Sequence, residues 1–350
     1  MDAKERVKLA EPYLRPVPTP SGFTSRDIVR RAIEFDDPPR VPYSFIQPLE
    51  SDFVEVSAAT GSASGMLNIP EGELSFDAWG VGWRGSGRLW GHAEVTPLAD
   101  LSALGGYRFP QILTPEGLAI VEEFARAGDA ANKYVVGGDP IMTYERLRSL
   151  MGFENMMVAM CADRERFERL LDKLTDMTIE FVQAYGSIGG VHAFMGAEDW
   201  GLQTSLQIKP AMWREIFKPR YSRIVDASHQ RGMHYILHSC GYIVDIIPDF
   251  IEVGVDVLQI DQPRLLGVDR LAREFGRRIC FWNCVDIQWS SRPEVTPAEA
   301  RAEAQYMVEK LACFGGGLMA RQYLQPWDIE MQLEKHHAIY QGFMDAGCRG

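Results

Sequence analysis

A histidine and a cysteine two residues apart end the apolar stretch 233–237, and Gly241 follows them. In an extended strand, residues i and i+2 project to the same side. The imidazole of His238 and the thiol of Cys240 should therefore point in one direction. Both groups are ligands that zinc prefers, and the glycine lets the backbone turn after the strand. The pattern predicts half of a metal site, with a packed, metal-free pair of side chains as the alternative.

The chain around this pair alternates strands and helices. The expected strands lie at 41–46, 133–139, 190–195, 233–238, 255–261, 279–284 and 317–322. The expected helices lie at 24–35, 114–129, 143–185, 209–231, 244–252, 268–275, 297–313 and 327–344. This alternation is typical of βα units around a parallel sheet.

About eight such units without a linker predict an α/β protein that forms one (β/α)₈ (TIM) barrel over residues 23–350, with a helical extension. Residues 1–22 are polar and broken by prolines, so we expect an arm laid over the surface. The Gly-rich segment 50–110 has no clear period. It is expected to form either a short strand pair or a long loop over the site.

Active sites of such barrels lie at the carboxyl ends of the strands, so side chains at the predicted strand ends are candidate functional residues. Asp261 and Cys284 end the two strands after the His-x-Cys strand, and Arg321 ends the last one. Glu198 and Asp199 follow the strand before it. Metal-competent groups therefore gather at one end of the barrel. Each also has a structural alternative, such as an ion pair, a turn cap or, for cysteine, a buried small apolar side chain.

Composition narrows the class of protein. A net charge of -12 without a cluster of Lys and Arg argues against nucleic acid as a partner. The start of the chain, 1–6, lacks the apolar core of a signal peptide, and no stretch approaches the ~18 apolar residues of a membrane span. We therefore expect a cytoplasmic protein without a membrane partner. Six scattered cysteines are expected to be thiols or metal ligands rather than disulfides.

Several stretches of the chain resemble the uroporphyrinogen decarboxylase superfamily. They are residues 25–32 with Arg40-Val41-Pro42, His238-Ser239-Cys240-Gly241, residues 247–256 and residues 281–288. Within the superfamily they look like the branch of cobalamin-dependent, corrinoid-linked methyltransferases. The resemblance runs from about 24 to 345 and is strongest after 197. It implies a (β/α)₈ barrel, a separate corrinoid protein as partner and a small-molecule methyl donor, and it is compatible with a homodimer.

The resemblance also implies a set of zinc ligands. Methyltransferases of this branch bind zinc through a His-x-Cys pair, an acidic residue at the end of the next strand and a cysteine on the last strand. Carried over to this chain, these are His238, Cys240 and Asp261. The last strand, 317–322, contains no cysteine. Cys284, a water or the substrate is therefore expected to occupy the fourth position.

The predicted reaction follows from an open zinc, which acts as a Lewis acid on an ether oxygen or a sulfur. Aromatic and thioether side chains near the predicted mouth favour a flat apolar ligand, so O-demethylation of a methoxylated aromatic is the first choice. The expected substrate-binding residues are Tyr43, Phe45, Trp79, Trp83, Met195, Trp200, Trp282 and Tyr323. Arg321 or Arg84 would hold a carboxylate or orient a phenolate, and Glu198 or Asp199 would relay a proton.

Two other classes of protein remain open. The first is a cofactor-free lyase that decarboxylates an aromatic or tetrapyrrole acid. True decarboxylases of the superfamily carry an arginine-glycine motif that grips propionate groups, and residues 50–69 lack it. The second is a binding protein or an inactive homologue. Release of carbon dioxide without a corrinoid partner would favour the lyase, and ligand binding without turnover would favour the binding protein.

Overall fold

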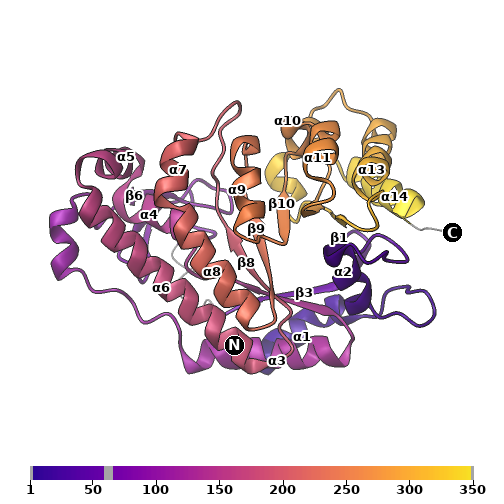
Figure 1. The fold of residues 1–350 in the computed structure, drawn as a ribbon, viewed down its shortest axis with the longest axis horizontal. Coiled ribbons are helices and arrows are strands. Elements are labelled where there is room, and N and C mark those ends of the chain that lie inside the picture. Colours follow the sequence, from indigo (N-terminus) through magenta and orange to yellow (C-terminus); the bar gives the residue numbers. More distant parts are fainter. Residues whose placement is uncertain (1–2, 59–65, 348–350) are drawn as a thin grey trace.

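A computed structural model describes residues 3–58 and 66–347 and contains the predicted barrel (Figure 1). Its strands are β1 (Tyr43–Ile46), β3 (Phe53–Ser57), β7 (Tyr134–Gly138), β8 (Ala193–Ala197), β9 (His234–His238), β10 (Val257–Ile260), β11 (Cys280–Asn283) and β12 (Leu318–Arg321). They neighbour one another in the order β1-β12-β11-β10-β9-β8-β7-β3, and every pair in this series is parallel. The expectation of a (β/α)₈ barrel is confirmed.

The barrel closes between β1 and β3 through a short hairpin strand, β2 (Leu49–Ser51), which pairs antiparallel with β1. Asp52 sits at the corner between β2 and β3. Its N–H donates to the carbonyl of Tyr43 and its carbonyl accepts from the N–H of Tyr134, so one residue joins both ends of the sheet. Its buried carboxylate forms two 2.7 Å hydrogen bonds with the guanidinium of Arg40. This ion pair stabilises the junction of β1, β2 and β3, which we call the seam of the barrel.

Helices cover the outside of the barrel. They are α1 (Ala3–Leu14), α2 (Ser25–Glu34), α3 (Pro115–Ala130), α4 (Thr143–Met151), α5 (Phe153–Ala162), α6 (Arg164–Ile188), α7 (Pro210–Ile216), α8 (Lys218–Gln230), α9 (Ile247–Glu252), α10 (Pro263–Leu266), α11 (Val268–Phe275), α12 (Ile287–Ser290), α13 (Pro297–Leu311) and α14 (Leu333–Gly347). Three 3₁₀ turns accompany them: η1 (Leu101–Gly106), η2 (Val244–Ile246) and η3 (Pro326–Ile329). Figure 1 shows α6 beside α8 and α13 beside α14. Among the described residues, no helix has both the length and the apolar character needed to cross a membrane.

Local sequence signals explain where several helices begin. Thr24 accepts a hydrogen bond from the N–H of Asp27, whose carboxylate accepts from the N–H of Thr24, and this capping box starts α2. Thr296 and Glu299 form the same arrangement at the start of α13. The amino-terminal arm predicted at 1–22 contains α1, which packs against α3 and β2.

The segment 50–110, which the sequence left unassigned, contains one barrel strand and a separate small sheet. The barrel strand β3 alternates only over five residues, which is too short a signal to separate from a loop. The small sheet is the antiparallel set β4 (Leu74–Phe76), β5 (Gly82–Arg84) and β6 (His92–Val95). The expected short strand pair is therefore part of a three-stranded sheet.

Side-chain parity divides the core into two layers. The inner layer fills the lumen and includes Phe53, Tyr134, Ile236, Trp282 and Met319. The outer layer lies between the strands and the helices and contains the alternate residues of the same strands. Because neighbouring residues of a strand face opposite sides, every strand residue is assigned to the lumen or to the helices by its parity.

A partly buried, neutral histidine gives the fold an acid-sensitive contact. Burial, reinforced by Arg26, lowers the pKa of His192 to about 4, and its Nδ1 accepts the N–H of Val135 at 2.9 Å. The unfolded chain binds the proton near pH 6.5, so this contribution to stability is complete above pH 6.5 and is lost as the pH falls toward 4. His192→Asn keeps an acceptor for Val135 without a proton to bind.

Urea unfolding at pH 7.5 and pH 4.5 checks this expectation. On acidification, the variant should lose roughly 2 kcal/mol less free energy of unfolding than the wild type. Equal losses for the two proteins would contradict a neutral, partly buried His192.

Candidate metal centre at the carboxyl ends of the strands

The registers of the parallel strands bring the candidate residues onto one edge. Five consecutive strands, β8 to β12, align the lumen-facing positions Ala197, His238, Gln259, Trp282 and Met319. Two residues further along, the same strands or the loops that follow them carry Asp199, Cys240, Asp261, Cys284 and Arg321. These five residues come together at the carboxyl end of the barrel, where such folds place active sites.

Asp199, His238 and Cys240 form a group of potential metal ligands whose donor atoms all lie within 4.8 Å of one another. The Nε2 atom of His238 is 3.4 Å from the Sγ atom of Cys240 and 3.5 Å from Oδ1 of Asp199. Zinc bonds of about 2.0 to 2.3 Å in a tetrahedron separate the ligand atoms by about 3.5 Å. The nitrogen, sulfur and oxygen donors therefore have the identity and the spacing that zinc requires, and three protein ligands leave a fourth position open.

Gln259 orients the histidine from the side away from these donors. Its Oε1 contacts Nδ1 of His238, so Nδ1 carries the proton and Nε2 offers its lone pair to a metal. Its Nε2 donates to Oδ1 of Asp261 at 2.7 Å. The thiol of Cys284 donates to the same carboxylate oxygen at 3.3 Å. Asp261 and Cys284 thus form a hydrogen-bonded second layer behind the imidazole.

The group of potential ligands differs in one residue from the ligand set expected from the sequence. His238 and Cys240 lie together as expected, but the carboxylate grouped with them is that of Asp199, which was expected to relay a proton. Asp261 lies close enough to raise the pKa of the His238 imidazole, yet it stands outside the group of three. Gln259 was missed, although its place two residues before Asp261 on the same strand was a usable signal.

Asp199, His238 and Cys240 shift one another's pKa values through hydrogen bonds and charge. Burial lowers the pKa of His238, but hydrogen bonds to Asp199 and Cys240 outweigh it and raise that pKa well above its usual range. Burial raises the pKa of the Cys240 thiol, against the opposing effect of His238. For Asp199, partial burial raises the pKa of the carboxyl, but the hydrogen bond to His238, the positive charge of that imidazole and hydrogen bonds to Cys240 together lower it below its usual range. The charge of each of the three groups therefore affects the pKa of the other two.

Three other expected site residues face the same lumen. Trp282 stacks on Phe53 with ring centroids 4.6 Å apart and forms part of the inner core. Met195 packs against that core and is partly exposed. Burial, together with the nearby Asp261 and Cys240, raises the pKa of Tyr323 to about 12. These side chains line the lumen on the strands that carry the potential ligands or on neighbouring strands.

Arg321 also faces the lumen, because it lies two residues beyond Met319 on β12. Its guanidinium carbon lies 5.1 Å from the centroid of the Trp282 ring. Glu55, at a lumen-facing position of β3, is exposed.

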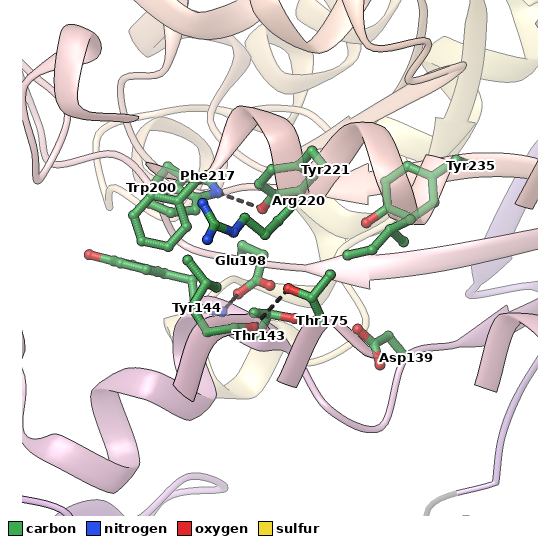
Figure 2. Close-up of a pocket in the computed structure, with 12 residues that line it drawn as sticks. Asp139, Thr143, Tyr144, Thr175, Glu198, Trp200, Phe217, Arg220, Tyr221 and Tyr235 are labelled. Carbon is green, nitrogen blue, oxygen red and sulfur yellow. Dashed lines mark hydrogen bonds between the residues drawn. The ribbon is translucent and has the colours of Figure 1, made fainter. Parts of the chain in front are cut away.

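Glu198 lies on the opposite side of β8 from Asp199. Its carboxylate accepts hydrogen bonds from the N–H groups of Tyr144 and Glu145 at the start of α4. Burial raises the pKa of this carboxyl well above its usual range. Figure 2 shows Glu198 in a small pocket that also contains Asp139, among side chains of the outer layer. The structure thus separates Glu198 from the metal-competent group, and it acts there as a cap for α4.

Most of the aromatic residues expected to bind substrate lie in the outer layer or the small sheet. Phe45 packs against Tyr340 and Phe343 of α14, with Tyr43 stacked on it. Both have the parity that faces the helices, so their position near a strand end did not bring them to the lumen. Trp200 packs against Tyr144 at 4.0 Å between ring centroids.

The other two tryptophans anchor the segment that precedes α3. The ring of Trp79 lies under the guanidinium of Arg146 at 4.5 Å, and both side chains are buried. The indole N–H of Trp83 donates to Asp77, which also pairs with Arg146. These contacts hold the small sheet against α4.

Known proteins resemble this chain in its fold and, over part of its length, in its sequence. Residues 135–282 match the family model of uroporphyrinogen decarboxylase. A uroporphyrinogen decarboxylase of Bacillus pumilus is 26% identical over 165 residues, a stretch that covers 47% of this chain and 42% of that relative. A methyltransferase from Methanosarcina mazei has a similar structure, with a TM-score of 0.60 and 16% identity over 97% of this chain and 90% of that chain.

The fold and the site define a (β/α)₈ barrel with a metal-competent group at the carboxyl ends of its strands. The resemblance to the uroporphyrinogen decarboxylase superfamily is confirmed, with the family match running from β7 to β11. The matched stretch includes His238, Cys240 and Gln259.

Proposed function

We propose that this chain is a zinc-dependent methyltransferase that moves a methyl group between a small methylated substrate and a corrinoid protein. The observation that carries the proposal is the group of Asp199, His238 and Cys240, with donor atoms spaced as the ligands of one zinc ion. A methyltransferase among the similar structures and the family match support the same class of enzyme. The favoured reaction is O-demethylation of a methoxylated aromatic.

In this proposal the chain's own residues have separate tasks. Asp199, His238 and Cys240 would hold the metal, and Gln259 would keep Nε2 of the histidine free for it. When bound, zinc supplies Lewis-acid stabilisation of the charge that develops on the oxygen losing its methyl group. Trp282 and Met195 would offer an apolar wall to an aromatic ring.

Product analysis tests the proposal. The purified chain, loaded with zinc, is incubated with a methoxyarene and a corrinoid protein, and the phenol and the methylated corrinoid are quantified. We expect equal amounts of both products, and no product from protein stripped of metal. A metal-free protein with full activity would rule the proposal out.

A decarboxylase is the second candidate, because the buried Arg321 in the lumen also suits the carboxylate of an acid. The same incubation distinguishes the two reactions. Carbon dioxide released from an aromatic or tetrapyrrole acid without any corrinoid would favour the lyase.

A further inference from the structure

Arg321 differs from the other buried arginines in having no partner within the described part of the chain. Arg40, Arg146 and Arg321 are 5%, 3% and 6% exposed. Arg40 pairs with Asp52 at 2.7 Å and Arg146 pairs with Asp77 at 3.1 Å. Among the same described residues, the side chain of Arg321 makes neither an ion pair nor a hydrogen bond, and its Nε atom is buried without an acceptor. A buried charge without a partner is strongly unfavourable unless a ligand supplies one.

Arg321 lies two residues beyond Met319 on β12, level with Cys284 and Asp261, which lie two residues beyond Trp282 and Gln259. Its guanidinium lies over the face of Trp282, which restrains it by a cation–π contact. Burial raises the pKa of the Cys284 thiol well above its usual range, and the positive charge of Arg321 partly opposes this rise. Arg321 therefore lies beside the second layer of the site and not on the outer surface.

The carboxylate of the second layer does not neutralise it. Asp261 accepts hydrogen bonds from Gln259 and Cys284. Among the described residues, it forms no ion pair with Arg321, whose Nε atom is buried without an acceptor. The donors of the guanidinium are left for a molecule that enters the lumen.

We propose that Arg321 binds a carboxylate of the substrate, so that the methylated compound handled by this site is an anion. A guanidinium presents two parallel N–H groups whose spacing matches the two oxygens of a carboxylate. The indole of Trp282 beside it offers an apolar wall for a planar substituent. The identity of the methylated compound rests on the proposed function, whereas the carboxylate site rests on Arg321 alone.

The alternative anchor considered from the sequence, Arg84, is already occupied. It lies on β5 of the small sheet, where its Nε and Nη2 atoms hold both oxygens of Glu94 at 2.7 and 2.5 Å. Arg84 therefore provides a matched control, since it is an arginine with a partner outside the lumen.

Calorimetric titration with 4-methoxybenzoate and its neutral isostere 4-methoxybenzamide tests the proposal. We expect the wild type to bind the acid about tenfold or more tightly than the amide. Arg321→Met should weaken binding of the acid by about 10- to 100-fold and leave the amide unchanged. Arg84→Met should bind both as the wild type does. Equal affinity of the wild type for acid and amide, no binding of either, or an unchanged affinity of Arg321→Met for the acid would overturn the proposal.

Thermal unfolding separates a binding role from a structural one. Without ligand, Arg321→Met should have a Tm equal to or above that of the wild type, because the substitution removes a buried unpaired charge. Added 4-methoxybenzoate should raise the Tm of the wild type and not that of the variant. A clearly lower Tm of the unliganded variant would show that the guanidinium stabilises the fold, and would overturn the proposal.

The two proposals fail in different ways. Binding of 4-methoxybenzoate that depends on Arg321, without methyl transfer to a corrinoid protein, would leave the carboxylate site intact and remove the methyltransferase. Methyl transfer from 4-methoxybenzoate that is unaffected by Arg321→Met would leave the methyltransferase intact and remove the carboxylate site.

Discussion

Cys240→Ser is expected to abolish stoichiometric zinc binding, while Cys284→Ser retains it. The thiol of Cys240 is grouped with His238 and Asp199, whereas the thiol of Cys284 donates to Asp261. Loss of a directly bound thiolate removes one of three protein ligands. Loss of an outer contact typically weakens metal binding about 10- to 100-fold, which leaves a tight site occupied.

Elemental analysis after dialysis measures the zinc content of each variant, and X-ray absorption at the zinc edge counts the sulfur neighbours. We expect about one zinc per chain with one sulfur ligand in the wild type. The exposed Cys313 provides the control, since Cys313→Ser should change neither result. Two sulfur ligands, or an equal loss of zinc in Cys284→Ser, would place Cys284 on the metal.

The carboxylate ligand can be identified in the same way. Asp199→Asn should lower zinc occupancy more than Asp261→Asn, because only Asp199 places an oxygen within 3.5 Å of Nε2 of His238. The reverse order would restore the ligand set that the family resemblance implies.

The second large effect concerns the seam of the barrel. Arg40→Met and Asp52→Asn should each lower the free energy of unfolding by about 3 to 5 kcal/mol, because each leaves a buried group without its partner. The side chains of Arg40 and Asp52 are 6% and 0% exposed, and the carboxylate also accepts the N–H of Tyr43. Loss of this pair loosens the junction between β1, β2 and β3.

Urea unfolding followed by circular dichroism measures the change. Arg301→Met is the matched control, since Arg301 pairs with Asp345 on the surface, where both side chains are nearly half exposed. Exposed pairs contribute little, so the control should stay close to the wild type. If Arg40→Met and Arg301→Met lower the free energy of unfolding by similar amounts, the burial of the Arg40–Asp52 pair does not determine its contribution to stability.

The fold could be predicted from the sequence because each unit carries its own local pattern. The strands β7 to β12 are apolar runs between helices with clear amphipathic faces, and their order along the chain fixes a parallel sheet. The strand β3 could not be predicted, because the exposed Glu55 interrupts its short apolar run. A polar residue at an inward position has no local signature that separates it from a loop.

The site could be predicted only in part, for a related reason. Strand parity placed His238 and Cys240 on one side, and the structure has them 3.4 Å apart. Tyr43 and Phe45 were instead assigned to the substrate site because they lie near a strand end. Their parity turns both side chains toward α14. Position along a strand and side of a strand are independent, and both are needed to place a residue in the lumen.

The sequence by itself determined the alternation that builds the barrel, the projection of His238 and Cys240 to one side, and the edge at which the candidate groups gather. Only the tertiary structure decided that Asp199 lies with this pair. It also decided that Asp261 accepts hydrogen bonds from Gln259 and Cys284. The Nε atom of Arg321 remains without an acceptor among the described residues. The physical reason is that local pattern fixes the side of a strand on which a residue lies. Partners across strands depend on the register and on hydrogen bonds between residues far apart in the chain.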